Sequence, residues 1–280
     1  MPKRRLTVGE AGELRTALHV AALDALMASR RWQPGELVFQ GGSSLHLAHG
    51  SPRFSEDLDF LVNARLKLDA LSGAMQARLT DTRWLPADTD LTVGIAKPNH
   101  NPYVFVVVIG GPNVIGAVRV KVELWRAPTP TVAGIKVVVA PVRVVRGPAA
   151  GMQTFVPTAD LTEILADKVF ALAARPYLKP RDVFDLYWLK THAKLSACSV
   201  PAFKARLATY PKETPSGWLA KARRRIEELP TAKHTIMTDL QRWLPSTWAL
   251  SEPVANDMIA LALEALHRGV GVMAEIEAEP

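Results

Sequence analysis

Apolar residues recur at helical intervals near the start of the chain. Leu14 and Leu18 follow Thr7, which has Glu10 three residues further on. A Thr and a Glu at this spacing before an apolar repeat form the capping box that typically begins a helix. We therefore expect a long first helix starting at Thr7, and a second helix over residues 66–79, where the helical spacing returns.

Short apolar runs separate and follow these helices. Residues 36–40 and 57–62 are predicted strands, and between them a Gly-Gly-Ser-Ser turn leads into a short helix over residues 45–48. From residue 90 to residue 145, Val and Ile dominate and Gly and Pro punctuate the chain. That pattern predicts three or four strands, with one hairpin turning near residues 110–113.

Helical spacing dominates the second half of the chain. The Gly- and Pro-rich residues 147–157 form the predicted boundary, and Asp160 with Glu163 marks a helix start beyond it. The sequence thus predicts an α+β fold, with a mixed sheet and flanking helices in residues 1–150 and an all-helical domain in residues 151–280. The helices predicted in this domain cover residues 160–174, 181–192, 201–209, 217–228, 234–243 and 253–267.

Charge and composition narrow the functional classes. The 280 residues include 34 Lys and Arg against 27 Asp and Glu, a net charge of +7. This favours a polyanionic partner such as a nucleic acid or a nucleotide. The single cysteine, Cys198, excludes an internal disulfide framework and a Cys-rich zinc site. Because no apolar run reaches membrane-spanning length and no signal-peptide pattern is present, we expect a cytoplasmic protein with no membrane partner.

Two carboxylates lie at alternate positions of the second predicted strand. Asp57 and Asp59 flank Leu58. Alternate residues of a strand share a face, so both carboxylates point away from the core that receives Leu58. They repel each other unless a divalent cation lies between them. Mg²⁺ prefers such oxygen ligands and keeps its other positions for waters and phosphate oxygens. The pair therefore predicts a metal site that serves a phosphate-bearing substrate.

A third carboxylate comes from a strictly alternating run over residues 117–125. Its valines take one face, and Arg119, Lys121 and Glu123 take the other. If this strand pairs beside Asp57 and Asp59, Glu123 completes a two-metal clamp. Lys121, in the same basic stripe, would attract a triphosphate.

The turn before the acidic strand suits phosphate binding. Its glycines, including Gly42, let the backbone approach a phosphate closely, and the N–H groups at a helix start favour an anion. The Ser43 hydroxyl and N–H would lie at the phosphate. We expect this turn to hold the phosphates of a nucleotide.

These motifs together resemble a known family. A Gly-Gly-Ser turn, a 13-residue spacer over residues 44–56 and then Asp-Leu-Asp resemble the nucleotidyltransferase signature of the DNA polymerase β superfamily. The fuller run, with Arg53 and Ser55 before the acids and Phe60 after them, is similar to that of the AbiEii/AbiGii toxin family. The family's Lys-x-Asp motif corresponds to Lys121-Val122-Glu123, in which Glu replaces the usual Asp.

A later motif of the family corresponds to Lys168, Arg175, Arg181-Asp182 and Asp185, so the resemblance runs from about residue 37 to residue 189. Lys168 and Arg175 are seven residues apart and share a helical face, which could meet a triphosphate or RNA. Asp182 could position Lys168 or act on the incoming hydroxyl, and the sequence leaves both alternatives open.

The resemblance implies a nucleotidyltransferase-like sheet domain and Mg²⁺-dependent transfer of NMP from NTP. It implies catalytic roles for Asp57, Asp59, Glu123, Lys168 and Asp182. The first three of these residues are also the expected metal ligands. The expected NTP-binding residues are Gly42, Ser43, Arg53, Lys121 and Arg175. The family is the toxin half of abortive-infection toxin–antitoxin systems, and some members modify the 3′ end of tRNA. An antitoxin protein, NTP, and tRNA or another RNA are therefore the expected partners, and a block of translation is the expected outcome.

Several alternatives remain open. The acceptor could be a protein hydroxyl or a small molecule, or the chain could bind a nucleic acid or a partner without turning over NTP. Arg53 could hold a phosphate or pair with Glu56. The basic run over residues 221–225 could be a solvated helix face or an RNA contact. His46 and His49 match no complete metal site, which favours a structural role.

Overall fold

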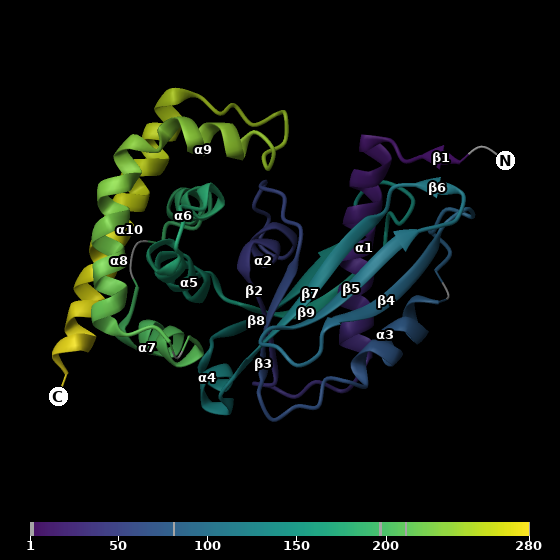
Figure 1. The fold of residues 1–280 in the computed structure, drawn as a ribbon, viewed down its shortest axis with the longest axis horizontal. Coiled ribbons are helices and arrows are strands. Elements are labelled where there is room, and N and C mark those ends of the chain that lie inside the picture. The colour runs from purple at the N-terminus through teal and green to yellow at the C-terminus, as the bar shows by residue number, and fades with distance from the viewer. Residues whose placement is uncertain (1–2, 81, 196–197, 211, 280) are drawn as a thin grey trace. The chain divides into compact units, whose positions relative to one another are not determined.

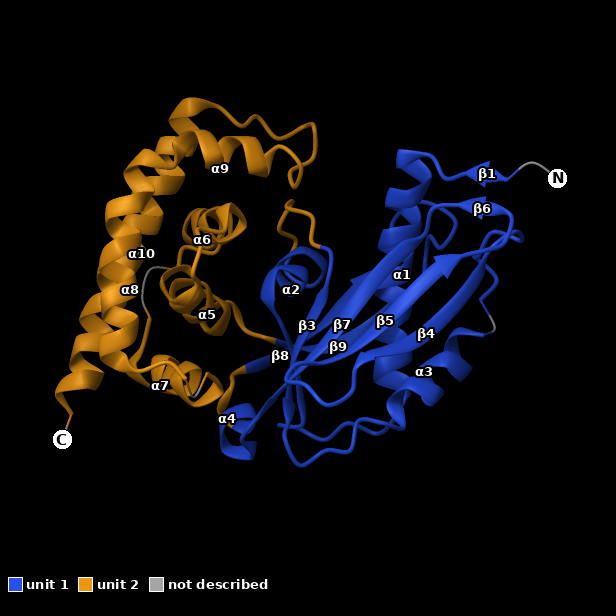
Figure 2. Ribbon diagram, in the orientation of Figure 1, with its two compact units in different colours: residues 1–49, 56–133, 137–158 blue, residues 50–55, 134–136, 159–280 orange. Residues whose placement is uncertain are grey.

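The computed structural model describes residues 3–80, 82–195, 198–210 and 212–279. The chain forms two compact units (Figures 1 and 2). Unit 1 comprises Met1–His49, Glu56–Ala133 and Val137–Thr158. Unit 2 comprises Gly50–Ser55, Gly134–Lys136 and Ala159–Pro280. Both units are therefore assembled from segments that are separated in the sequence.

Unit 1 is built on a mixed sheet. Its strands are β2 (Leu37–Gln40), β3 (Leu58–Asn63), β4 (Asp90–Lys97), β5 (Tyr103–Gly110), β7 (Val118–Ala127), β8 (Val137–Arg143) and β9 (Gln153–Ala159). They lie in the order β4-β5-β7-β3-β2-β9-β8. β3 runs parallel to β7 and β2 parallel to β9, whereas the β2–β3, β4–β5 and β5–β7 pairs are antiparallel. β1 (Arg4–Arg5) and β6 (Val114–Ile115) form a separate two-stranded parallel sheet.

Helices cover one face of this sheet. Unit 1 contains α1 (Val8–Ala28), α2 (Gly41–Leu47), α3 (Leu71–Leu79) and α4 (Thr129–Gly134). The predicted capping box of α1 is confirmed, since Thr7 Oγ1 accepts from the Glu10 N–H at 3.2 Å and the Glu10 carboxylate accepts from the Thr7 N–H at 3.3 Å. α1 packs on β5 and β7, and α3 packs on β4 (Figure 1). Phe60 and Val122 are fully buried beneath them. The opposite sheet face is thus the one left for polar side chains.

From Leu161 to Ala278 the described elements of unit 2 are helices. They are α5 (Leu161–Ala174), α6 (Pro180–His192), α7 (Val200–Thr209), α8 (Pro215–Glu228), the 3₁₀ helix η1 (Leu229–Thr231), α9 (Lys233–Leu240) and α10 (Glu252–Ala278). Trp218 is fully buried and its Nε1 donates to the Phe170 carbonyl at 3.0 Å. The Phe203 ring lies edge-on to Trp218 with centroids 5.5 Å apart. These aromatic side chains form the centre of the helical core.

Several predicted boundaries differ from the structure. The segment at 147–157, predicted as a linker, contains most of β9, because Thr158 pairs with Phe39 in the sheet. The division between the units accordingly follows Thr158 rather than residue 150. α2 begins at the glycines rather than at Leu45, and α3 begins at Leu71 rather than at residue 66, because the Asn63 side chain accepts from the Arg65 N–H at 3.0 Å and holds a turn there.

α10 extends well beyond the predicted end at residue 267. Gly269 and Gly271 are part of the helix, and a Cβ on Gly269 would lie 2.8 Å from Val169 Cγ1. Glycine therefore lets α10 approach α5 closely. Within the described residues, no helix is both long and apolar enough to span a membrane.

Candidate active site

Asp59 and Glu123 lie side by side on adjacent parallel strands. The register of β3 and β7 pairs Asp59 with Glu123 and Leu58 with Val122. One row earlier, the Lys121 ammonium lies 3.7 Å from the Asp57 carboxylate. The expected pairing of the Glu123 strand beside Asp57–Asp59 is thus confirmed. Because β-strand side chains alternate, Asp59 and Glu123 belong to the sheet face opposite α1 and α3. The contact with Lys121 places the Asp57 carboxylate, directly before β3, on the same side.

Local packing explains why this face stays polar. In β7 the valines and Leu124 are buried in the core, whereas Arg119 and Lys121 are exposed and Glu123 is half-buried. Asp57 and Asp59 are also half-buried, while the intervening Leu58 is fully buried. The acids therefore sit on a rigid sheet but remain accessible to a charged ligand.

Gly41 has a role that sequence reasoning missed. Its φ is +77°, and a Cβ there would lie 2.8 Å from Asp59 Oδ2 and 3.3 Å from Asp59 Cβ. A side chain at position 41 would thus occupy the space of the Asp59 carboxylate, besides the strain of a left-handed conformation. The first glycine of the motif makes room for Asp59. The predicted phosphate contact of Gly42 stays a prediction.

The two serines of the same motif bind protein groups. The buried Ser43 hydroxyl donates to the Asp57 carbonyl oxygen, so it fixes the backbone directly before the acidic strand. The Ser44 hydroxyl bonds to Thr158, whose own hydroxyl donates to the Phe39 carbonyl at 3.1 Å. These bonds tie α2 to β2 and β9. A contact of Ser43 with a phosphate stays a prediction, whereas its positioning of Asp57 is a feature of the structure.

His19 supports the same region from α1. Its Nε2 lies 2.8 Å from the carbonyl oxygen of Glu56, the residue before Asp57. Burial lowers the pKa of His19 to about 4, so its ring is neutral at neutral pH and donates this hydrogen bond. The sequence gave no signal for this role, because a lone histidine in a helical repeat has no distinguishing pattern.

The later family motif forms a buried ion network within unit 2. Lys168 Nζ lies 2.9 Å from Asp182 Oδ1 and 2.9 Å from Asp185 Oδ2. Arg175 Nε lies 3.0 Å from Asp182 Oδ2. α5 supplies the lysine and α6 supplies both aspartates, so the two packed helices hold the network together.

Arg53 completes this network from the segment Gly50–Ser55. Arg53 donates two hydrogen bonds to the Asp185 carboxylate, from Nε at 2.7 Å and from Nη2 at 2.9 Å. Its Nη1 donates to the Phe54 carbonyl at 2.8 Å. Its side chain is only 2% exposed. Arg53 therefore has a structural role and pairs with Asp185 rather than with Glu56, whereas the prediction that it binds NTP stays a prediction. A bidentate guanidinium–carboxylate pair fixes both groups strongly.

Electrostatics favours charged forms throughout the network. Burial alone would lower the pKa of Lys168, but the charges of Asp182 and Asp185 outweigh burial and raise it above its usual value. Burial opposes the ionised form of Asp182, yet Lys168 and Arg175 hold its pKa well below the usual range. A carboxylate with a lowered pKa is a weak proton acceptor. Of the two alternatives for Asp182, the geometry thus favours positioning of Lys168.

The donor set of unit 1 suits a hard divalent cation. Asp57, Asp59 and Glu123 offer only carboxylate oxygens, and Mg²⁺ commonly takes one or two protein carboxylates together with substrate phosphates. Within the described residues, no group of three or more His, Cys, Asp or Glu side chains is gathered closely enough to hold a metal on its own. The Asp59–Glu123 pair therefore fits a metal that arrives with its nucleotide.

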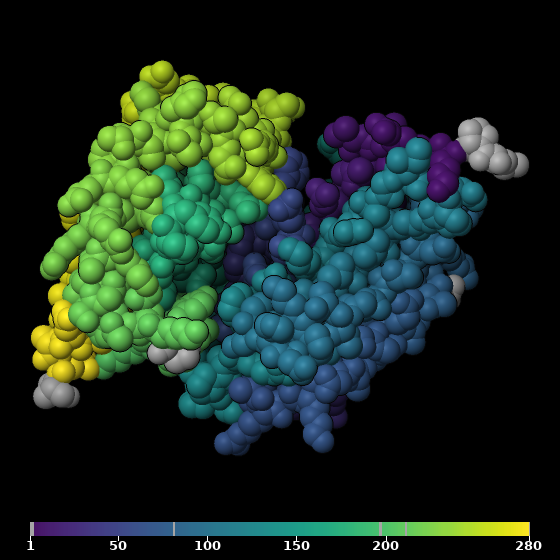
Figure 3. Space-filling model, in the orientation of Figure 1, coloured from purple at the N-terminus to yellow at the C-terminus, as the bar shows by residue number. Residues whose placement is uncertain are grey.

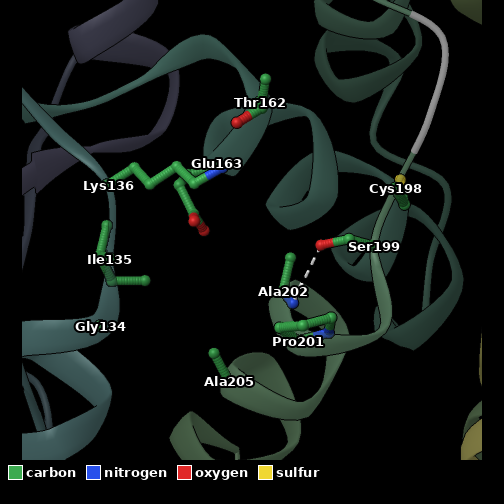
Figure 4. A pocket seen from close by; sticks show the side chains of 10 residues that line it. All are labelled: Gly134, Ile135, Lys136, Thr162, Glu163, Cys198, Ser199, Pro201, Ala202 and Ala205. Carbon is green, nitrogen blue, oxygen red and sulfur yellow. Dashed lines mark hydrogen bonds between the residues drawn. The ribbon is translucent and has the colours of Figure 1, made fainter.

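A cavity in unit 2 is lined by none of the predicted site residues. This cavity of about 520 Å³ lies between the segment Gly134–Lys136 and the starts of α5 and α7 (Figure 4). Ser199 caps α7 there by accepting from the Ala202 N–H at 3.4 Å, as the dashed line shows. Burial raises the pKa of Cys198 to about 11, which keeps this thiol protonated and unreactive near neutral pH.

Comparison with solved structures identifies the class of fold. The chain aligns with a candidate nucleotidyltransferase from H. pylori at a TM-score of 0.55 and 18% identity, covering 95% of this chain and 98% of the other. JHP933 from Helicobacter pylori aligns at a TM-score of 0.51 and 19% identity, covering 93% and 96%. MenT4, a nucleotidyltransferase toxin from Mycobacterium tuberculosis, aligns at a TM-score of 0.52 and 15% identity, covering 96% and 86%. The fold is that of the nucleotidyltransferases.

The family model is more specific. Residues 24–250 match the model described as "Nucleotidyl transferase AbiEii toxin, Type IV TA system", and the chain belongs to this family. No curated protein matches it. Membership confirms the resemblance deduced from the motifs. It also implies an NTP substrate and an antitoxin partner.

Proposed function

We propose that this chain is a Mg²⁺-dependent toxin that transfers NMP from NTP to the 3′ end of tRNA in the cytoplasm and thereby blocks translation. The observation that carries the proposal is the in-register pairing of Asp59 with Glu123. It places two carboxylates on neighbouring strands of the polar sheet face, one row from Asp57. The family and the net charge of +7 support a nucleotide substrate and a polyanionic acceptor.

In this reaction the acceptor hydroxyl oxygen attacks the α-phosphorus of the NTP. A bond forms between these atoms, the bond from the α-phosphorus to the bridging oxygen breaks, and pyrophosphate leaves. The hydroxyl proton passes to one of the half-buried carboxylates or to a neighbouring group. Asp57, Asp59 and Glu123 would hold a divalent cation together with the NTP, and that cation would stabilise charge on the phosphate oxygens.

The remaining residues bind and orient. Lys121, half exposed beside Asp57, is placed to attract the triphosphate. Gly42 and Ser43 are proposed to contribute backbone N–H contacts, and Arg175, about one-third exposed, a cationic contact. Lys168 and Asp182 are proposed to act as one fixed pair, because each is already held by the other.

The test is transfer of α-labelled nucleotide. The full chain, Mg²⁺ and each of the four NTPs are incubated with total tRNA and with cell-extract protein. We expect label on tRNA with the native chain and none with Asp59→Asn. Asp90→Asn is the matched control, since Asp90 is an exposed aspartate on the edge strand β4. Label on protein would replace tRNA by a protein acceptor. Absence of label with all NTPs and both fractions would contradict the proposed tRNA transfer.

A further inference from the structure

A basic pocket lies in unit 2 where the end of α5 meets α8. Its volume is about 400 Å³. The charged residues that line it are Arg175, Lys221, Arg224, Arg225 and a single acid, Glu228. Much of the light green surface in Figure 3 belongs to residues near α8. The pocket thus concentrates positive charge at one place on the surface of unit 2.

Two of these cations are committed to the protein. Arg225 is buried, and it donates from Nε to the Leu172 carbonyl at 2.9 Å and from Nη2 to the Arg175 carbonyl at 2.8 Å. It therefore satisfies carbonyl groups that the end of α5 leaves unpaired. Lys221 pairs with Glu213 at 2.6 Å. These two residues build the wall of the pocket.

Arg224 differs from both. Its side chain is exposed, and among the described residues it has no ion-pair partner. A guanidinium group in this situation keeps its five N–H donors available for an incoming anion. Arg175 also lines the pocket, but its Nε already pairs with Asp182 at 3.0 Å. Arg224 is therefore the residue that we expect to contact a phosphate there.

An exposed aromatic residue directly follows the pocket lining in the chain. Tyr177 is 64% exposed and follows Pro176, a lining residue whose ring fixes the local backbone. Exposed aromatic rings next to basic grooves are the usual platforms for unpaired bases, which stack on them with little dependence on sequence.

We propose that this pocket binds a backbone phosphate of single-stranded RNA, with the adjoining base stacked on Tyr177. The inference rests on the proposed function, in which the acceptor is an RNA. Arg224 recognises the phosphate, because a guanidinium group matches phosphate oxygens in geometry and charge. Of the four basic residues in the run over residues 221–225, two are structural, Arg224 binds the phosphate, and Arg223 lies outside the pocket lining.

The experiment measures RNA binding by fluorescence anisotropy without any NTP. The probe is a fluorescein-labelled single-stranded RNA of about 12 nucleotides, within the usual range of such sites. Arg224→Gln is compared with Arg223→Gln, a neighbouring exposed arginine outside the pocket lining. Both arginines precede a glutamate by four residues, so the two substitutions disturb α8 equally.

We expect Arg224→Gln to weaken binding and to reduce the slope of log K against log salt concentration by about 0.7, the value for one lost phosphate contact on a single strand. Arg223→Gln should leave both quantities unchanged. Equal effects of the two substitutions would overturn the proposal in favour of general charge attraction. If Arg224→Gln instead weakens NTP binding and spares RNA, the pocket is a nucleotide site and the proposal is wrong.

Tyr177 gives an independent readout. Tyr177→Ala should weaken RNA binding about tenfold without changing the salt slope, and Tyr177→Phe should restore it. Native affinity in Tyr177→Ala would refute the stacking contact. Because these measurements need no turnover, they separate the two hypotheses: transfer to tRNA together with unchanged RNA affinity in Arg224→Gln would retain the function and reject the pocket.

Discussion

The carboxylate of Asp59 fills the space into which a side chain at position 41 would project. Gly41 has a φ of +77°, and a Cβ on it would approach Asp59 Oδ2 to 2.8 Å. The glycine motif and the acidic motif are therefore a single structural unit. A substitution in the glycine motif should therefore impair activity by displacing the Asp59 carboxylate.

We predict that Gly41→Ala abolishes nucleotide transfer and lowers the free energy of unfolding by about 1–2 kcal/mol or more. The loss of about 1–2 kcal/mol comes from placing a non-glycine residue in a left-handed backbone conformation, and the contact with Asp59 adds to it. Gly116→Ala is the control, since Gly116 has a φ of +100° and no atom within 4 Å of its virtual Cβ. The Gly116→Ala variant should be less stable than the native protein but should retain nucleotide transfer. Equal retention of activity by both variants would show that Asp59 tolerates displacement.

Glu123 should matter through its charge. Glu123→Gln is expected to lower kcat/KM for NTP transfer by about 10²-fold, the usual effect of removing one electrostatic contact to a transition state. Glu123→Asp keeps the charge and restores the residue usual in the family, so it should retain much more activity. Circular dichroism should show no change in fold, because Glu123 is half-buried and faces away from the core. A fully active Glu123→Gln would remove this residue from the site.

Arg53 should stabilise the protein. Arg53→Met leaves Asp185 buried without its bidentate partner, and we expect a loss of about 3–5 kcal/mol in the free energy of unfolding. Denaturant titration measures this loss. Lys204→Met is the control, because Lys204 and Glu279 form an exposed ion pair with side chains 47% and 46% accessible, and such pairs contribute about 0–1 kcal/mol. If Arg53→Met kept full stability and lost NTP binding, the original assignment of Arg53 to the nucleotide would be correct.

Because His19 is buried in its neutral form, we predict that the stability of the fold decreases at acidic pH. Its pKa in the folded protein is about 4 instead of the ordinary 6.5. The unfolded chain therefore takes up this proton at a higher pH than the folded chain does. Stability should fall as the pH drops from about 6.5 towards 4, by at most about 3 kcal/mol. His19→Gln should flatten this part of the curve, and substitution of the exposed His100 should not. An unchanged slope in His19→Gln would assign the acid sensitivity to other groups.

Much of the fold follows from local patterns. The capping residues of α1 and the alternation of β7 are short-range signals, and both elements form where predicted. The alternation also determined which face carries Glu123. Pairing with the acidic strand then required only that the two apolar faces join one core. The residues that we propose to face a substrate were thus visible in the sequence.

The contacts that hold these residues were not visible. Arg53 and Asp185 are 132 positions apart, and nothing in either local sequence indicates the other. β9 was missed because its Gly- and Pro-rich surroundings resemble a linker, whereas its pairing with β2 is a tertiary effect. Ser43 and Gly41 carried a phosphate-binding pattern, but their close packing against the Asp57–Asp59 segment depends on atoms that sequence spacing does not specify.

The position of Arg53 also constrains how the chain can be made and divided. Its partner Asp185 belongs to α6, so the helical unit includes a piece of polypeptide synthesised long before its helices. During translation, the ion pair between Arg53 and Asp185 can form only after α6 has left the ribosome. A fragment expressed from residue 159 onward would lack Arg53, so the buried Asp185 would keep its ion pair with Lys168 but lose its bidentate guanidinium partner. The C-terminal half is therefore not an independent module that recombination could transplant intact.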